Sequence, residues 1–254
     1  MVKLSVNVNK IATLRNSRGG RLPDPVEAAR VCVDAGSPGI TVHPRADQRH
    51  IRPSDVRAIA GFLAPLRGRV EFNIEGDPRA DLIEMVRDTR PDQCTLVPVR
   101  PGEITSQAGW PPDTPREELG EIVADLRRRG IRVSMFVDPE PAPIRWAALL
   151  GADRIELYTE PYARAFEAGE STARVSFAKY AAAAELAHAE GLGVNAGHDL
   201  DLDNLVIFRE LPHLDEVSIG HAIMSRAVFV GLAAVVSEYL TVLADAASKT
   251  AKDH

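Results

Sequence analysis

Cysteine is scarce in this chain, and so are long apolar runs. The 254 residues include two cysteines, Cys32 and Cys94, which lie far apart in apolar surroundings and form no C-x-x-C motif. This usage argues against a disulfide framework and favours buried, reduced thiols. No stretch reaches the ~18–20 apolar residues that span a membrane, and the first residues lack the apolar run of a signal peptide. We therefore expect a cytoplasmic protein with no membrane partner.

An excess of positive charge is also missing. Lys and Arg number 30 against 36 Asp and Glu, so the formal net charge is −6. A nucleic-acid surface needs clustered cations, and the short run Arg127–Arg129 is better explained as a solvated helix end. No nucleic-acid partner is expected. The chain has no linker or low-complexity stretch, which predicts a single domain over residues 1–254 with a polar tail from about residue 247.

What the chain does contain is a short β-rich segment followed by a helical one, repeated eight times. Strands are predicted at Leu4–Val8, Gly39–His43, Val70–Ile74, Gln93–Val97, Arg132–Val137, Arg154–Tyr158, Gly193–Asn195 and Glu216–Ile219. Helices are predicted near residues 25–36, 53–65, 79–88, 115–130, 142–150, 174–190, 202–210 and 221–246. Parallel strands need crossover helices, so this order predicts the α/β class and a (β/α)8 TIM barrel. An open, doubly wound sheet is the alternative.

Alternation within the strands indicates which side chains face the barrel interior. In the first strand the apolar set alternates with a polar set made of Ser5, Asn7 and Asn9. Because apolar groups suit the helix layer, the polar set should point inward, together with His43, Glu71 and Glu156. Buried charges are costly unless they are paired or functional. A structural network, with Arg154 neutralising a neighbouring glutamate, is the alternative for any one of them.

Active sites of this fold lie at the carboxyl ends of the strands, and several acid–base groups are expected there. The candidates are Asn7, Asn9, His43, Arg45, Glu71, Glu156, His198, Gly220 and His221. Histidine titrates near neutrality, and a carboxylate beside it can serve as a second acid–base group. Arg45 can form a fork on a phosphate, with His50 as a further donor. No metal-ligand motif is present, so no metal is expected, although ligands from separate strands would leave no motif.

Two similar segments predict a phosphate site. NAGHDL (195–200) and SIGHAI (218–223) each place Gly-His after a strand, and the second opens a long helix. The loops after strands 7 and 8 of such barrels often bind phosphate, aided by helix N-termini. Simple strand-ending turns are the alternative.

The loop over 98–115 is interpreted as a lid hinged at its glycines, with Thr105 reaching the substrate. A disordered surface loop is the alternative.

Four blocks of the chain resemble one known family. IATLRNSRGG (11–20), GITVHPRADQRHI (39–51), NAGHDL and IGHAI are similar to the signatures of pyridoxine 5′-phosphate synthases, in the same order along nearly the whole chain. The resemblance implies a condensation, without metal or cofactor, of 1-deoxy-D-xylulose 5-phosphate with 3-amino-2-oxopropyl phosphate. The products would be pyridoxine 5′-phosphate, inorganic phosphate and water. It also implies a homo-oligomer, commonly an octamer in the family.

The resemblance further implies roles for individual residues. His43 and Glu71 match the family's proton acceptors, and His198 matches its proton donor. Glu156 matches the residue that stabilises the transition state. The matches to substrate contacts are Asn7, Arg18, Gly220 and His221 for the amino-ketone phosphate and Arg45, His50 and Thr105 for the deoxyxylulose phosphate.

Two positions depart from the family pattern. Asn9-Lys10 replaces the Asp-His of many members, and Asp199 follows His198 where glycine is common. Lys10 can still donate to a phosphate or hydroxyl, and the backbone N–H of Asp199 can still contact a phosphate. These departures keep open a phosphate-sensing barrel without turnover. A sugar-phosphate epimerase or aldolase is the other alternative, although the fifth and sixth strands lack the lysine that an aldolase needs.

Overall fold

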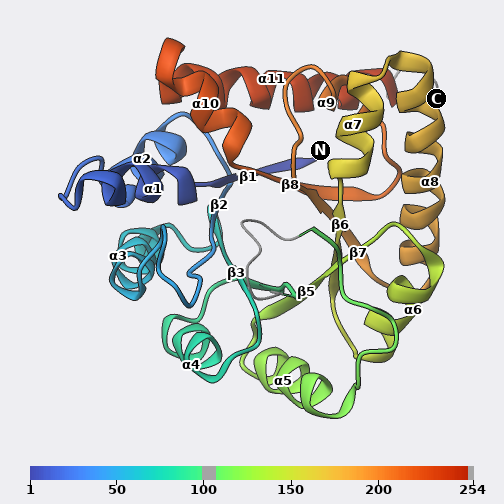
Figure 1. Ribbon diagram of the computed structural model, residues 1–254, viewed down its shortest axis with the longest axis horizontal. Coiled ribbons are helices and arrows are strands. Elements are labelled where there is room, and N and C mark those ends of the chain that lie inside the picture. Colours follow the sequence, from blue (N-terminus) through green and yellow to red (C-terminus); the bar gives the residue numbers. More distant parts are fainter. Residues whose placement is uncertain (99–106, 251–254) are drawn as a thin grey trace.

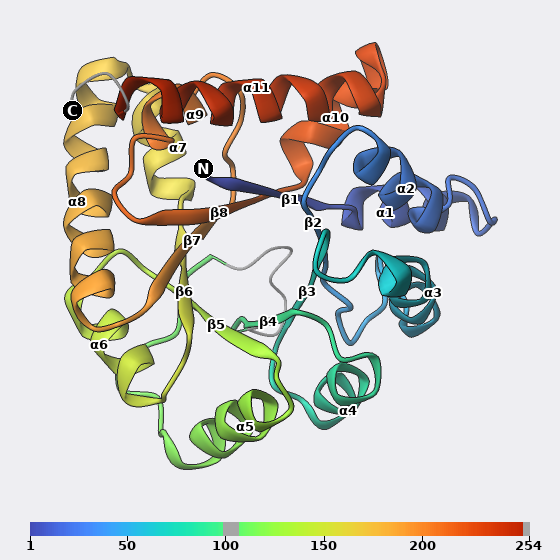
Figure 2. The same cartoon turned by 180° about the vertical axis from the view of Figure 1, so that it is seen from behind.

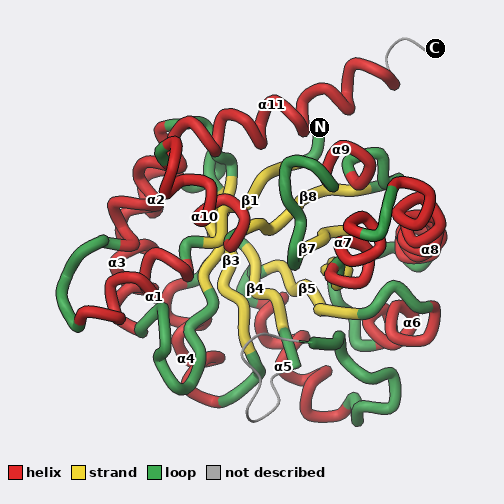
Figure 3. The backbone as a smooth tube through the Cα atoms, turned by 45° about the horizontal axis from the view of Figure 1, so that its top comes forward, coloured by secondary structure: helices red, strands yellow, loops and turns green. Residues whose placement is uncertain are grey.

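The computed structural model describes residues 1–98 and 107–250, except for the side chains of 245–250. Within these residues, parallel strands β1 to β8 follow one another in sequence order and close into a barrel, with β8 beside β1 (Figure 1). Figure 3 shows the strands in yellow inside a ring of red helices. The predicted (β/α)8 barrel is confirmed. No helix in the described part is long and apolar enough to cross a membrane.

The strands lie close to their predicted positions, and the differences at their ends affect the site. Their bounds are β1 Lys3–Asn7, β2 Gly39–Val42, β3 Glu71–Gly76, β4 Gln93–Leu96, β5 Arg132–Val137, β6 Arg154–Tyr158, β7 Gly193–Gly197 and β8 Leu214–Ile219. Strand β3 continues two residues past its predicted end at Ile74, because Glu75 and Gly76 pair with Thr95 and Leu96 of β4. The inward-facing row of β3 is therefore one position longer than expected.

The helices include two that the sequence analysis did not predict, α1 and α7. Their bounds are α1 Asn9–Arg18, α2 Pro25–Asp34, α3 Pro53–Leu63, α4 Ala80–Thr89, α5 Glu117–Arg128, α6 Pro141–Leu149, α7 Glu160–Glu167, α8 Glu170–Ala189, α9 Leu205–Phe208, α10 His221–Val230 and α11 Leu232–Thr250. A 3-10 turn, η1 (Ala64–Leu66), follows α3. The single helix expected over 221–246 is divided at Gly231, whose φ is 89°. Its second half, α11, packs on α2 and β1 (Figure 2) and continues to Thr250, past the predicted start of the tail.

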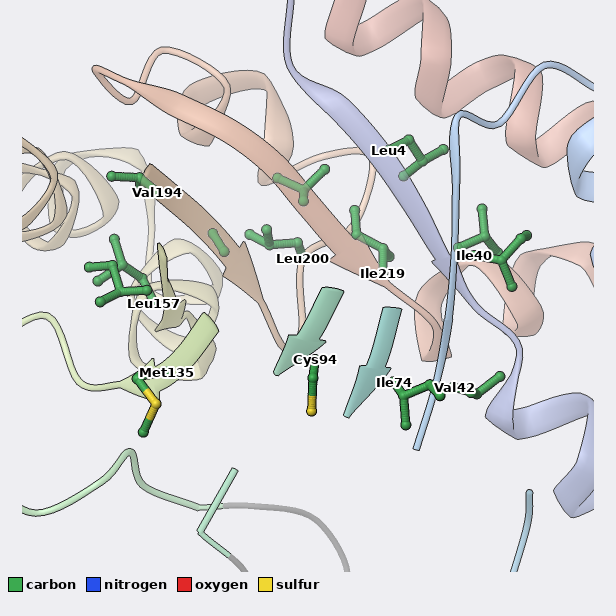
Figure 4. Close-up of a cluster of buried hydrophobic side chains, with 14 of the residues drawn as sticks. Leu4, Ile40, Val42, Ile74, Cys94, Met135, Leu157, Val194, Leu200 and Ile219 are labelled. Atoms are coloured by element: carbon green, nitrogen blue, oxygen red, sulfur yellow. The ribbon is translucent and has the colours of Figure 1, made fainter. Parts of the chain in front are cut away.

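The apolar side chains of the strands form the layer beneath the helices, as their alternation predicted. Figure 4 shows members of this layer, including Leu4, Ile40, Ile74, Met135, Leu157 and Val194. Each fully buried side chain of this size stabilises the fold by roughly 1.5–3 kcal/mol. Both cysteines are free and buried, Cys94 within this layer.

The barrel interior is polar and hydrogen-bonded from strand to strand. The Ser5 and Thr41 hydroxyls lie 2.6 Å apart, Asn73 donates to Thr41 at 3.3 Å, and Thr95 donates to Asn73 at 3.1 Å. The inward direction predicted for the polar set of β1 is therefore correct at Ser5. These bonds satisfy groups that would otherwise be costly to bury.

Glu71 occupies the opposite mouth of the barrel from the one predicted for it. It is the first residue of β3, and its carboxylate accepts hydrogen bonds from Lys3 and Arg132, each at 2.5 Å. These partners lie at the amino ends of β1 and β5. The prediction that Glu71 joins the groups at the carboxyl-end mouth is wrong. Four residue steps along the strand, or roughly 13 Å, separate Glu71 from Glu75, which lies at the carboxyl-end mouth.

Candidate active site

The carboxyl ends of the strands open into a cavity of about 600 Å³. The predicted site residues that line it are Asn7, Asn9, Lys10, His43, Arg45, His50, Glu156, His198, Asp199, Gly220 and His221. Arg18 lies on the exposed end of α1 and is not among the lining residues. Thr105 and the rest of the stretch 99–106 of the predicted lid lie outside the described residues. The structure thus gathers nearly all of the described candidates at one mouth.

The cavity also contains residues that the sequence analysis missed. They are chiefly Thr13, Arg49, Glu75, Phe136, Arg164 and Ser218. A signal was available for Glu75, because it shares the inward parity of Glu71 and Asn73. The segment Glu75-Gly76-Asp77 reads locally as a turn, which hid the last inward position of the strand. Arg164 comes from α7, whose existence was not predicted.

Glu75 and His43 face each other at the base of the cavity. His43 Nδ1 lies 3.9 Å from Glu75 Oε2, too far for a hydrogen bond. The carboxyl accepts from Asn7 Nδ2 at 3.4 Å and from the Ser218 hydroxyl at 3.3 Å. Burial, followed by the nearby charge of Glu216, raises the pKa of Glu75 to about 7. A carboxyl with this pKa can both take up and release a proton at neutral pH.

His43 is held as a neutral base. Burial lowers the pKa of His43 well below its usual value, and the positive charges around it add to this shift. Its backbone N–H donates to Asn9 Oδ1 at 2.9 Å, while the N–H of Asn9 donates to Asn7 Oδ1 at 3.0 Å. The ring Nε2 is buried without a hydrogen-bond partner in the described part of the chain. A buried polar atom of this kind is suited to a partner supplied by a ligand.

Glu156 is another buried carboxyl of the cavity, and its surroundings favour the protonated form. Burial raises the pKa of Glu156 well above its usual value, and the charges of Glu75 and Glu216 raise it further. Its Oε2 has no hydrogen-bond partner in the described part. A Cβ added to Gly197 would lie 2.4 Å from Glu156 Oε1, so the close approach of the carboxyl requires glycine there. A protonated Glu156 can donate a hydrogen bond to a developing negative charge.

His198 is fixed by aromatic rings and by backbone conformation. Its ring centroid lies 4.9 Å from that of Phe136 and 5.4 Å from that of Tyr158. Burial lowers the pKa of His198, while the charges of Asp199 and Glu160 oppose this effect. His198 and Asp199 both adopt left-handed φ values, 84° and 55°. The left-handed φ at position 199 explains why glycine is common there in the family. Aspartate adopts left-handed φ values more readily than most other residues.

The loops predicted to bind phosphate are neighbours at the cavity. Strands β7 and β8 pair with each other, and the residues after both strands line the cavity. A Cβ at Gly220 would lie 3.0 Å from both the Cβ and the carbonyl oxygen of Asn7, so this glycine lets β1 and β8 approach closely. Asp199 does not cap the following turn. That role belongs to Asp201, whose Oδ1 accepts from the N–H groups of Asp203 and Asn204. Phosphate binding at these loops stays a prediction.

The wall that follows β1 and β2 is cationic and is formed by α1 and the loop between β2 and α3. Lys10 lies on α1, and Arg45 and Arg49 lie on the loop with His50. Burial and the charges of Arg45 and Lys10 lower the pKa of His50 to about 4. Its Nδ1 accepts from the N–H of Ile51 at 2.9 Å, so the neutral ring carries its proton on Nε2. This wall offers donors and positive charge to an anion.

Within residues 1–98 and 107–244, no group of three or more His, Cys, Asp or Glu side chains is arranged to hold a metal ion.

A family model described as "Pyridoxal phosphate biosynthesis protein PdxJ" matches residues 4–245. The chain belongs to the PdxJ family. It is therefore an enzyme of vitamin B6 biosynthesis, as the resemblance implied.

Relatives of known name support the membership in PdxJ. The chain is 50% identical over 244 residues to the pyridoxine 5′-phosphate synthase of Christiangramia forsetii, covering 96% of this chain and 100% of that protein. It is 52% identical to the enzyme of the same name from Xanthomonas campestris pv. campestris, covering 98% of each. Among solved structures, phosphoribosyl anthranilate isomerase from Thermotoga maritima superposes with a TM-score of 0.60 at 13% identity, over 96% of this chain and 100% of that one. Likeness at that identity shows the barrel fold alone.

Proposed function

We propose that the chain is a pyridoxine 5′-phosphate synthase that condenses 1-deoxy-D-xylulose 5-phosphate with 3-amino-2-oxopropyl phosphate. The observation that carries this proposal is the cavity, which joins two imidazoles of lowered pKa and two carboxyls of raised pKa to a cationic wall. Full-length relatives near 50% identity bear this enzyme's name. A cavity of about 600 Å³ is also of suitable size for two small phosphorylated molecules.

The acid–base steps divide among the groups according to their protonation. Schiff-base formation requires a proton to move from the attacking amine to the carbinolamine oxygen, a role for His43 with Glu75. Loss of inorganic phosphate needs an acid near the leaving oxygen, and His198 is proposed for it in its protonated form, which the charges of Asp199 and Glu160 favour. Ring closure needs proton abstraction to form an enol-type carbon nucleophile. Each general acid–base group contributes about 10²–10⁴-fold, so several are needed in sequence.

The remaining groups are proposed to bind the substrate phosphates and to stabilise the charge that develops during the reaction. Lys10, Arg45 and Arg49 are proposed to hold one substrate phosphate, and the loops after β7 and β8 to hold the other. Glu156 in its protonated form is proposed to stabilise the oxyanion that develops during condensation. The Asn9 side chain orients His43 by accepting a hydrogen bond from the His43 backbone N–H. This role needs only an acceptor oxygen, so it does not depend on the aspartate that many family members have at this position.

The proposal is tested by incubating the protein with both phosphates. We expect pyridoxine 5′-phosphate and inorganic phosphate to form in equal amounts, with no product when either substrate is omitted. The product is followed by chromatography and the phosphate by a coupled assay. His43→Asn serves as the inactive control, with the same melting temperature as the wild type. Tight binding of either phosphate without any product would instead support the phosphate-sensing barrel.

A further inference from the structure

Helix α1 is joined to the start of α3 by a buried ion pair. Arg15 is 5% exposed, and its guanidinium donates to Asp55 Oδ1 at 2.6 Å and to Oδ2 at 2.8 Å. Asp55 Oδ2 also accepts the N–H of Arg52 at 2.8 Å, which caps the first turn of α3. A forked, buried pair of this kind fixes both partners in one geometry. Arg15 belongs to the block IATLRNSRGG (11–20). Most residues of this block have no role in the proposed reaction.

The next residue of α1 holds the loop that precedes α3. Arg15 Nε donates to Asn16 Oδ1 at 3.1 Å, which decides the direction in which the Asn16 amide points. The Asn16 Nδ2 atom then points at three backbone carbonyl oxygens. It lies 2.9 Å from that of His50, 3.2 Å from that of Arg49 and 3.4 Å from that of Gln48. An amide nitrogen has two hydrogens, so three carbonyls in succession share them.

The loop held in this way carries Arg45, Arg49 and His50 of the cationic wall of the cavity. Gln48 has a φ of 50°, a left-handed conformation that is uncommon outside glycine and must be held by its surroundings. At its other end, the loop is tied to α1 through the hydrogen bond from the His43 N–H to Asn9. Neither Arg15 nor Asn16 lines the cavity. Both can act on a ligand there only through the loop.

We infer that Arg15 and Asn16 are positioning residues that hold the backbone of residues 48–50 so that Arg45, Arg49 and His50 meet a substrate phosphate. The inference rests on the proposed function, because it deepens the account of the same site. Helix α1 thereby sets the affinity of the cationic wall. A role in folding alone is the alternative, and it would change stability without changing phosphate affinity.

The test compares substitutions at Asn16 with matched changes at its neighbour. Asn16→Ala removes the amide, and Asn16→Asp turns a carboxylate towards three carbonyl oxygens. Ser17 is exposed on the same helix and its hydroxyl donates to the Leu14 carbonyl, so Ser17→Ala and Ser17→Asp control for the truncation and for the added charge. Asn16→Ala should raise the KM for the deoxyxylulose phosphate by about threefold to tenfold, the effect of about one lost hydrogen bond. The KM for the amino-ketone phosphate and kcat should stay within about twofold.

A direct binding measurement separates this inference from the proposed function. Inorganic phosphate is titrated into each variant by calorimetry, a readout that does not need turnover. Weaker phosphate binding in both Asn16 variants, with both Ser17 variants like the wild type, supports the positioning role even if the wild type makes no product. A lower melting temperature with unchanged KM and phosphate affinity would overturn it. In an Arg45→Ala background, Asn16→Ala should have a smaller effect than alone, since coupled residues are not additive; full additivity would contradict the mechanism.

Discussion

Two glutamates of β3 have the same parity and opposite environments. Burial by itself would raise the pKa of Glu71, but its ion pairs with Lys3 and Arg132 outweigh burial and lower it. In the described part of the chain Glu75 accepts hydrogen bonds from the neutral groups of Asn7 and Ser218, and burial with a neighbouring carboxylate raises its pKa to about 7. Of the two, Glu75 is therefore the one suited to acid–base chemistry near neutral pH. Glu71 is a permanent anion that joins three strands at the other mouth.

This contrast predicts different results for the same substitution at the two positions. Glu75→Gln should lower kcat by about 10²–10⁴-fold, the usual contribution of a general acid–base group. Glu71→Gln should leave kcat within about threefold and lower the melting temperature slightly, because it weakens two partly exposed ion pairs. Steady-state rates and thermal unfolding of both variants decide the matter. A larger loss of turnover at Glu71 than at Glu75 would restore the assignment made from the sequence.

At the scale of elements, the junction of β6 with α7 supports the end of β7. The hydroxyl of Thr159 is fully buried and donates to the carbonyl oxygen of Gly197 at 2.7 Å and also to that of His198. The Thr159 N–H donates to the same Gly197 oxygen at 3.1 Å. These bonds hold the chain where it enters the left-handed conformation of His198. Helix α7 thus affects the site through its first turn as well as through the side chains that line the cavity.

Thr159→Val should lower the free energy of unfolding by about 1–3 kcal/mol, because the Gly197 and His198 carbonyl oxygens lose the hydroxyl donor while the volume is nearly unchanged. The Gly197 oxygen would keep the Thr159 N–H. Thr159→Ser keeps the hydroxyl and should recover most of that loss. Denaturant unfolding monitored by circular dichroism measures both. If the valine variant were as stable as the wild type, the hydroxyl would not be holding the strand end, and the left-handed backbone would need another explanation.

At the scale of the whole molecule, the barrel is filled by polar side chains that include several carboxyls. Glu216 is 2% exposed and accepts from Asn195 at 3.3 Å and from Gln93 at 3.5 Å. Burial and the charge of Glu71 raise the pKa of Glu216 to about 7. Since the unfolded chain ionises this group near 4.5, the folded state loses relative stability as pH rises through that interval.

Glu216→Gln removes this titration while leaving an oxygen that can accept the same hydrogen bonds. The variant should match the wild type in stability below about pH 4.5, become progressively more stable relative to it as the pH approaches 7, and keep a constant advantage above that. Urea unfolding at a series of pH values checks the sign. An advantage that shrank with rising pH would mean that the carboxylate is stabilised in the fold by the arginines near it.

Much of the architecture could be read from the amino-acid order because it depends on local periodicity. Side chains alternate every second residue along a strand whatever its neighbours are, so the inward direction of Glu156 followed from β6 alone. Glycine before His198 and His221 marked the strand ends in the same way. The family resemblance supplied roles that no spacing could, and the structure gathers eleven of the predicted residues in one cavity.

The end of β3, the presence of α1 and the hold of Asn16 on the loop could not be read from the sequence. Glu75 belongs to a strand because Thr95 of β4 lies beside it, 20 residues away in the chain. Asn16 finds its carbonyls 32 to 34 residues further on. Closure of the barrel brings such partners together. Their hydrogen bonds supply the free energy that favours a continued strand over a turn. Local preference at Glu75-Gly76 favours a turn, and the hydrogen bonds of the neighbouring strand outweigh it.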